Sequence, residues 1–260
     1  MTRPSTSFSG PDLCALSARE TVRLLKSGQV SAAEVLEASE ARIEQVEPAV
    51  NATVIRAGAR ARQQIEALAK HADQPINEPG WLSGLPIAIK DLTLVSGLPA
   101  TFGSLALKDT VAQTSDPLVE RLETRGAIIV GKTNTPEFGA GGNTFNAVFG
   151  QTRNPWNTSR NAGGSSGGAA VSLATGEVWL SHGSDLAGSL RTPAAYCGVV
   201  GLRPTPGRCG GGPAATAFSI EGIAGPMARD TRDLELFLDS SLTGEAGASS
   251  ERGRDGRRDV

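Results

Sequence analysis

Apolar side chains recur at every third or fourth position through much of the first fifty residues, which is the period of an α-helix with one buried face. Each of two such stretches follows a serine that stands three residues before a glutamate, namely Ser17 before Glu20 and Ser31 before Glu34. This arrangement is a capping box, so we predict two amphipathic helices. A charged, alanine-rich stretch predicts a third helix from about Ile55 to His71. The apolar positions of the first two helices are Val22, Leu24, Leu25, Val35, Leu36, Ile43 and Val46.

Beyond residue 84, short apolar runs alternate with stretches of helical pattern. The runs LPIAIK, AIIVGKT and VWLSHGSD predict buried strands, while DPLVERLETRG and AAVSLATG predict helices between them. This alternation predicts an α/β fold with a mixed, largely parallel sheet covered by helices on both faces, in one domain over residues 1–242. The stretch 243–260 holds eight charges and few apolar side chains, which predicts a disordered polar tail.

The charge balance argues against two classes of partner. With 25 basic and 27 acidic residues the net charge is -2, so the chain carries no electrostatic footprint for nucleic acid or an anionic membrane. A small molecule is the expected ligand. The N-terminal residues lack the apolar core of a signal peptide, and no apolar run is long enough to span a bilayer, so we expect a soluble, cytoplasmic protein.

Cysteine and histidine are too sparse for the usual metal sites. The three cysteines, Cys14, Cys197 and Cys209, show no CxxC spacing, and His71 and His182 are the only histidines. We therefore predict no disulfide framework, no metal and no other cofactor. Glycine is abundant, and it concentrates between Gly139 and Gly225, where active-site loops would find the backbone freedom that they need.

Two short motif matches fail in their context. The segment GAIIVGKT at 126–133 fits the GxxxxGK[ST] pattern of a phosphate-binding loop, but its variable positions are apolar and β-branched, which favours a buried strand. A nucleotide-binding module is therefore only a distant alternative. The segment GGSSG at 163–167 fits the GxSxG nucleophile elbow, which requires an acid and then a histidine downstream. Only His182 follows, with Glu177 as the one acid between, so we predict that His182 lines or supports a loop.

Without a histidine, the base that remains for a nucleophilic serine is a neutral lysine. Lys90 ends the run LPIAIK, where burial among apolar neighbours would lower its pKa. Taken alone, a lysine at the end of a strand is more often an exposed charge. The two serine-containing loops favour the interpretation of Lys90 as the base. Ser165 and Ser166 stand among four glycines, and Ser189 follows small residues that leave backbone N–H groups free to stabilise an oxyanion.

These segments resemble the amidase signature family. The resemblance rests on GGSSGG from Gly163 and GSDLAGSLRTP from Gly183, with 75 residues from Lys90 to Ser165 and 24 from Ser165 to Ser189. It extends to GLPIAIKD, GKTNTPEF, GLRPT and GPMAR, and it covers roughly residues 16–238. It implies the amidase signature fold and hydrolysis of a carboxylic amide to an acid and an amine or ammonia.

The resemblance also implies a role for each matched residue. Ser189 would be the nucleophile that forms an acyl-enzyme, Ser165 a bridging serine after a cis peptide bond, and Lys90 the base. The implied oxyanion-hole donors are the N–H groups of Leu186, Ala187, Gly188 and Ser189. The implied supporting residues are Ser166, Ser184 and Asp185, which would hydrogen-bond around the site, and Arg191, a structural cation.

The sequence departs from the family pattern in two places. Ala187 stands where the family usually has glycine, which would strain the backbone if the position needs a positive φ. Family members also continue well beyond GPMAR, so we expect that a C-terminal part is missing, which would leave a sheet edge open to pairing, including in a homo-oligomer. A truncated non-catalytic relative and an amidotransferase-like subunit therefore stay open as alternatives.

Overall fold

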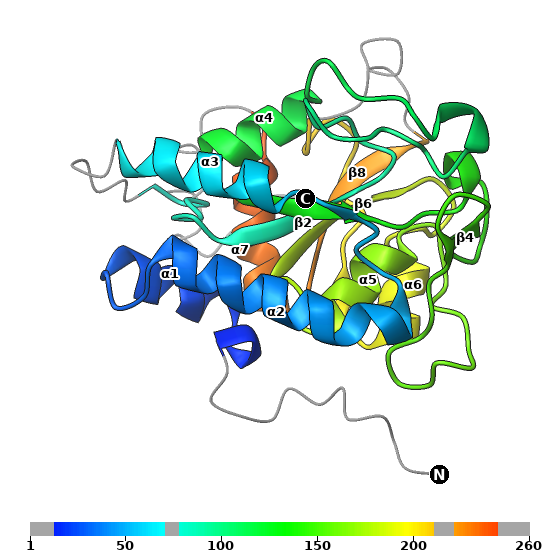
Figure 1. The fold of residues 1–260 in the computed structure, drawn as a ribbon, viewed down its shortest axis with the longest axis horizontal. Coiled ribbons are helices and arrows are strands. Elements are labelled where there is room, and N and C mark those ends of the chain that lie inside the picture. Colours follow the sequence, from blue (N-terminus) through cyan, green and yellow to red (C-terminus); the bar gives the residue numbers. More distant parts are fainter. Residues whose placement is uncertain (1–12, 71–77, 211–220, 244–260) are drawn as a thin grey trace, which may run out of the picture.

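The protein is described here from a computed structural model, which defines residues 13–70, 78–210 and 221–243. A six-stranded sheet in the order β1-β3-β2-β6-β8-β7 forms the centre of the molecule (Figure 1). A two-stranded hairpin, β4-β5, lies apart from it. The strands are β1 (Ile55–Arg56), β2 (Pro86–Lys90), β3 (Ile128–Thr133), β4 (Phe145–Asn146), β5 (Gly150–Gln151), β6 (Leu180–Asp185), β7 (Val200–Gly201) and β8 (Ile223–Ala228).

The sheet is mixed and largely parallel, as the sequence predicted. β2 lies between β3 and β6 and is parallel to both, whereas β1 and β8 are antiparallel to their neighbours β3 and β6. β7 is antiparallel to β8 and therefore runs in the same direction as β6. Because β2, β3 and β6 are parallel, their last residues, Lys90, Thr133 and Asp185, meet at one edge of the sheet. That edge is where ligands bind in open α/β sheets.

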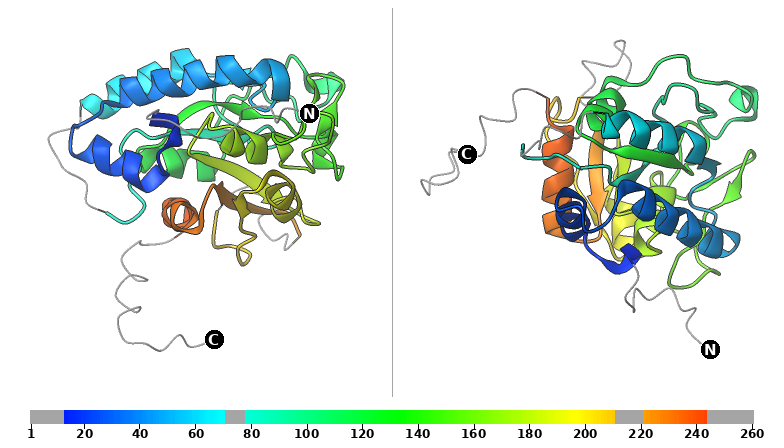
Figure 2. Two further views of the ribbon diagram at one scale, coloured as in Figure 1. Left: turned by 90° about the horizontal axis from the view of Figure 1, so that it is seen from below. Right: turned by 60° about the vertical axis from the view of Figure 1, so that its left-hand side comes forward.

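Helices cover both faces of the sheet, again as predicted. Buried residues of α1, α4 and α7 join one apolar cluster, and those of α3, α5 and α6 join the other, while α2 contributes to both. Figures 1 and 2 show α2 and α7 on opposite sides of the sheet. The helices are α1 (Ala18–Lys26), α2 (Ala32–Val50), α3 (Gly58–Ala69), α4 (Pro117–Thr124), α5 (Gly167–Ala174), α6 (Arg191–Cys197) and α7 (Thr231–Ser241), with 3-10 turns at Leu13–Ala15, Leu105–Leu107 and Glu137–Gly139.

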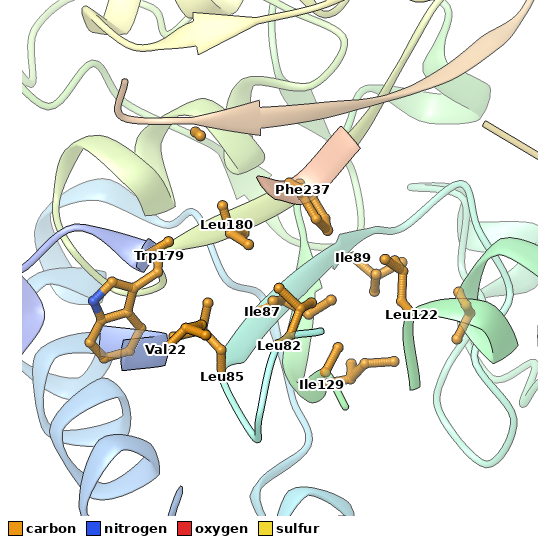
Figure 3. Packing of buried hydrophobic residues seen from close by; sticks show 14 of the residues in the cluster. Val22, Leu82, Leu85, Ile87, Ile89, Leu122, Ile129, Trp179, Leu180 and Phe237 are labelled. Carbon is orange, nitrogen blue, oxygen red and sulfur yellow. The ribbon is translucent and has the colours of Figure 1, made fainter. Parts of the chain in front are cut away.

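Successive side chains of β2 point to opposite faces of the sheet, so the strand contributes to both apolar clusters. Ile87 and Ile89 point into the first cluster, where they pack with Leu180 of β6 and Phe237 of α7 (Figure 3). Ala88 belongs to the second cluster, so Lys90, two residues further, starts from the same face as Ala88. Every residue of β2 is buried, so the lysine at the end of this strand is shielded from solvent.

The backbone N–H groups at the start of α1 find hydrogen-bond acceptors in α7, near the C-terminal end of the described chain. Asp233 in the first turn of α7 accepts hydrogen bonds from the backbone N–H groups of Ala18, at 2.7 Å, and of Arg19, at 3.0 Å. Ser17, the N-cap of α1, accepts from the N–H of Glu20 at 3.1 Å. Side chains thus supply acceptors for three backbone N–H groups that a helix start leaves unpaired.

Two details differ from the sequence predictions, and one prediction falls on residues that the structure does not describe. The third helix begins at Gly58 rather than near Ile55, because Ile55 pairs with β3 as part of β1, and it ends at Ala69. Only Ser31 forms a complete capping box, since the carboxylate of Glu20 binds Arg23 instead of the N–H of Ser17. Residues 71 and 244–260, which include nearly all of the predicted polar tail, lie outside the described residues.

Candidate functional site

The side chain of Lys90 reaches a group of serine hydroxyls at the carboxyl edge of the sheet. Its Nζ lies 2.6 Å from Oγ of Ser165, 2.9 Å from Oγ of Ser166 and 3.1 Å from Oγ of Ser184. The sequence predicted apolar surroundings, but the ammonium position is lined by hydroxyls, while the stem is fully buried. Four of the predicted site residues are therefore in direct contact.

Burial lowers the pKa of Lys90 to about 7, although the nearby Asp185 carboxylate acts to raise it. The cause is desolvation, which penalises the charged form of a buried amine. Hydroxyl groups can both accept from an ammonium and donate to a neutral amine, so the contacts suit either protonation state. At neutral pH a large share of Lys90 is an unprotonated amine that can accept a proton.

The glycines around Ser165 and Ser166 let this loop approach other backbone segments closely. A Cβ on Gly168 would lie 2.4 Å from the backbone nitrogen of Asn134, and one on Gly167 would lie 2.2 Å from Oγ1 of Thr144. The Gly164–Ser165 peptide bond is cis. Ser166 precedes α5, and its hydroxyl donates to the carbonyl of Ser184 at 3.1 Å. The loop is thereby tied to the end of β6.

Ser189 lies on the neighbouring loop, which follows β6. Its carbonyl accepts from the N–H of Ser166 at 3.3 Å, and its half-buried hydroxyl makes no hydrogen bond with any described residue. In particular, no hydrogen bond joins the hydroxyls of Ser165 and Ser189 within the described part of the chain. The N–H groups of Leu186, Ala187 and Ser189 likewise have no acceptor among the residues that the structure describes.

Gly188 differs from the other three residues of this loop. Its N–H donates to Oδ1 of Asp185 at 2.7 Å, so this group is already engaged. The positive φ of the loop, 109°, also falls on Gly188, and Ala187 is not among the described residues with positive φ. The alanine that departs from the family pattern therefore carries no left-handed strain.

The carboxylate of Asp185 holds the Ser189 loop through several hydrogen bonds. Besides Gly188 it accepts from the N–H of Leu190 at 3.1 Å and from the Nε of Arg191 at 2.9 Å. Arg203 donates to its backbone carbonyl. Burial raises the pKa of Asp185, but the hydrogen bonds from Arg191, Gly188 and Leu190 outweigh it and hold that pKa far below the ordinary value. Asp185 is thus an anion, as a residue that anchors N–H groups and a guanidinium must be.

The structure shows two polar features that the sequence did not. His182 lies inside β6, and burial together with the nearby Lys90 lowers its pKa to about 3. Neither ring nitrogen has a hydrogen-bond partner among the described residues. Lys132 ends up buried in β3, where it forms an ion pair with Asp91. The available sequence signal for both was a titratable residue within a run that predicted a buried strand.

The alternative motifs can be judged from the same geometry. The segment matching a phosphate loop includes the strand β3, all six residues of which are buried. Its lysine, Lys132, forms an ion pair with Asp91.

Among residues 13–70, 78–210 and 221–243, no group of three or more histidine, cysteine, aspartate or glutamate side chains is placed to hold a metal ion. No helix in these ranges is both long and apolar enough to cross a bilayer.

Comparison with known proteins gives matches over most of the chain. A glutamyl-tRNA(Gln) amidotransferase subunit of Carboxydothermus hydrogenoformans is 42% identical over 231 residues, which are 87% of this chain and 47% of the relative. Among solved structures, a bacterial aryl acylamidase of the amidase signature family superposes with a TM-score of 0.82 at 37% identity, covering 88% of this chain and 48% of the other. A 6-aminohexanoate cyclic dimer hydrolase superposes with a TM-score of 0.80 at 34% identity, covering 90% and 48%.

The chain thus spans about half the length of the relatives that it matches. The family model described as Amidase matches residues 34–252, which is most of the chain and includes Lys90, Ser165 and Ser189. The fold, the carboxyl-edge site and these matches agree with one another. The chain belongs to the amidase signature family of amidohydrolases.

Proposed function

We propose that this protein hydrolyses a carboxylic amide, with Ser189 as nucleophile, Ser165 as proton relay and Lys90 as base. The observation that carries the proposal is the contact of 2.6 Å between Nζ of Lys90 and Oγ of Ser165. At this distance a proton can pass between the two groups. Burial of Lys90, which lowers its pKa to about 7, supports a neutral amine at working pH.

In the proposed reaction, Lys90 takes the proton of Ser165 while Ser165 takes that of Ser189. The Oγ of Ser189 then attacks the amide carbon, and the carbonyl oxygen becomes an oxyanion. The proton returns through the same groups to the amide nitrogen, the C–N bond breaks, and the amine leaves behind an ester of Ser189. Water repeats the sequence and releases the acid.

We propose that the backbone after β6 provides the oxyanion donors. Leu186, Ala187 and Ser189 have N–H groups without acceptors in the described part of the chain, which supports the proposal that they bind the oxyanion. Each such donor contributes about 3 kcal/mol to transition-state stabilisation. Gly188 was predicted as a fourth donor. With its N–H bonded to Asp185, we propose that Gly188 shapes the loop and would donate only if that bond opened.

The relay also requires a movement. The hydroxyls of Ser165 and Ser189 are not hydrogen-bonded to each other, so they must come within hydrogen-bond distance when a substrate occupies the site. Catalytic hydrogen bonds often tighten in this way only in the substrate complex. Ser166 and Ser184 would hold the Lys90 amine in place during that change, and Asp185 with Arg191 would hold the loop.

A second candidate is a subunit that works together with other chains. It is favoured by the 42% identity to a glutamyl-tRNA(Gln) amidotransferase subunit, while the chain spans 47% of that relative. In that case the same residues would release ammonia from an amide donor, and turnover would depend on further polypeptide. A non-catalytic relative is the third candidate.

A serine-reactive fluorophosphonate probe separates these candidates. We expect the probe to label the wild-type chain and to leave Ser189→Ala unlabelled. The matched control is Ser159→Ala, because Ser159 is exposed and its hydroxyl bonds only to Asn157. Labelling together with hydrolysis of simple aryl or aliphatic amides supports the amidase, and labelling without hydrolysis supports the subunit. A wild-type chain that resists the probe would refute the catalytic proposal.

A further inference from the structure

A buried ion pair lies next to the candidate site and has no part in the proposed reaction. Nζ of Lys132 on β3 binds Oδ1 of Asp91, the residue after Lys90, and both side chains are at most 1% exposed. Asp91 and Lys90 are consecutive at the end of β2, so their side chains leave opposite faces of the sheet. Charges buried this completely are costly unless each has further hydrogen bonds.

Those further hydrogen bonds all go to one loop, residues 99–103. Nζ of Lys132 donates to the carbonyl of Pro99 at 2.7 Å. Oδ2 of Asp91 accepts from the hydroxyl of Thr101 at 2.5 Å, and that hydroxyl accepts from the N–H of Gly103 at 3.0 Å. The ion pair and Thr101 therefore fix the path of this loop.

The loop in turn holds the turn that follows β3. The carbonyl of Phe102 accepts from the N–H of Phe138 at 2.7 Å, and the two rings stack with centroids 6.5 Å apart. Ser104 adds a hydrogen bond of 2.7 Å to the carboxylate of Glu137. Phe138 is 58% exposed, so its position depends on these contacts rather than on burial in the core.

The turn reaches the candidate site through Gly139. A Cβ built on Gly139 would lie 3.7 Å from Oγ of Ser165 and 2.5 Å from Cδ1 of Leu92. Gly139 therefore lies close to Ser165, whose hydroxyl is the one nearest to the Lys90 amine, and to Leu92, two residues after Lys90. Ser165 itself is 3% exposed.

We infer that Asp91, Lys132 and Thr101 are positioning residues that fix the Phe138–Gly139 turn against Ser165. The inference rests on the proposed function for the role of Lys90 as base. A displaced turn would admit water beside Ser165 and Lys90, which removes part of the desolvation that favours the neutral amine. The ion pair thus acts through the loop and the turn and does not touch the reacting atoms.

The test measures the protonation of Lys90 directly. The chain has only five lysines, Lys26, Lys70, Lys90, Lys108 and Lys132, so selective labelling with ¹³C at Cε gives a spectrum that single substitutions can assign. Titration of the Lys90 signal is followed in the wild type, in Thr101→Val and in Lys132→Met. Thr21→Val is the matched control, because Thr21 is equally buried and its hydroxyl bonds only within α1, to the carbonyl of Ser17.

We expect Thr101→Val and Lys132→Met to raise the pKa of Lys90 by about one unit or more, a part of the several units that full burial can produce. Thr21→Val should leave it at the wild-type value. If both test variants fail to fold, Phe138→Ala, at an exposed position, should give a shift in the same direction. A low wild-type pKa that all folded test variants retain would overturn the inference alone. An ordinary wild-type pKa near 10.5 would overturn the base assigned in the proposed function and the inference with it.

Discussion

Replacing Glu177 with glutamine should change how the stability of the fold depends on pH. Glu177 is fully buried between α5 and β6, where it accepts hydrogen bonds from Thr53 Oγ1 at 2.5 Å and from Thr175 Oγ1 at 2.8 Å. Burial and the adjacent carboxyl of Glu47, which also hydrogen-bonds with Glu177, raise its pKa to about 8. Among the described residues, Arg42 is the cation bonded to this loop, and its Nε donates to the carbonyl of Thr175. At neutral pH, Glu177 is therefore mainly a neutral acid.

The magnitude follows from proton linkage. Between the ordinary pKa of 4.5 and the folded value of about 8, the unfolded chain has lost a proton that the folded chain retains. The stability due to Glu177 is fully present below pH 4.5 and is lost progressively up to about pH 8. The slope is about 1.4 kcal/mol per pH unit, so the wild type should lose about 3 kcal/mol from this group between about pH 5.5 and 7.5.

Glutamine suits the site because it cannot ionise and can keep the hydrogen bonds. Its carbonyl can accept from Thr53. Its amide can donate to Glu47 and to Thr175 Oγ1, whose own proton then goes to the carbonyl of Val171, 2.8 Å away. Relative to the wild type, Glu177→Gln should therefore become more stable as the pH rises.

The assay is urea unfolding at the two pH values, followed by fluorescence of the buried Trp179. The difference between variant and wild type isolates Glu177 together with its neighbour Glu47, because Lys90 and Asp185 titrate in both proteins. Glu123→Gln is the control, since it changes a partly exposed carboxylate that pairs with Arg60 on the surface of α3 and α4. A difference in unfolding free energy that stays constant with pH would refute the reasoning.

Three further variants or conditions test the site and the packing. With Lys90 at a pKa of about 7, kcat/KM should fall about tenfold per pH unit below that value and level off above it; a rate without this acid limb would exclude Lys90 as the base. Gly168→Ala should lower the unfolding free energy by about 1–3 kcal/mol, because the new Cβ would lie 2.4 Å from the Asn134 nitrogen, whereas Gly142→Ala has open space and should cost little; equal effects would contradict the packing. Phe237→Ala should cost about 3–5 kcal/mol in the same unfolding assay, because Phe237 is buried in the first apolar cluster, and a cost near that of the exposed Phe145→Ala would be inconsistent with the fold.

The parts of the fold that the sequence predicted are those with a local cause. β2 and β3 follow from uninterrupted apolar runs, and α4 begins at Pro117, directly after the capping residue Asp116. β8 was not predicted, because IAGPMA contains a glycine and a proline that disfavour strands. It forms through pairing with β6 over six residues, which tertiary contacts impose against local preference.

The site divides in the same way. Motif spacing identified Lys90, Ser165 and Ser166, and the structure brings the three together. The sequence could not predict two other features, the hydrogen bond from the Gly188 N–H to Asp185 and the ion pair of Asp91 with Lys132. Each depends on how a loop or strand is placed in three dimensions. Sequence patterns name the residue types that chemistry needs, but not which of their donors are already occupied.

The two hydrogen bonds from α1 to Asp233 have a consequence for biosynthesis. Asp233 follows Ala18 by 215 residues, so a ribosome working at about 5–20 residues per second makes the acceptor roughly 10 to 40 seconds after the helix that needs it. A helix of nine residues is marginal alone in water, and the apolar side chains of α1, Val22 among them, have no α7 to pack on during that interval. The nascent chain should therefore emerge with an incomplete first helix, whose two N–H acceptors on Asp233 arrive only once α7 has been made.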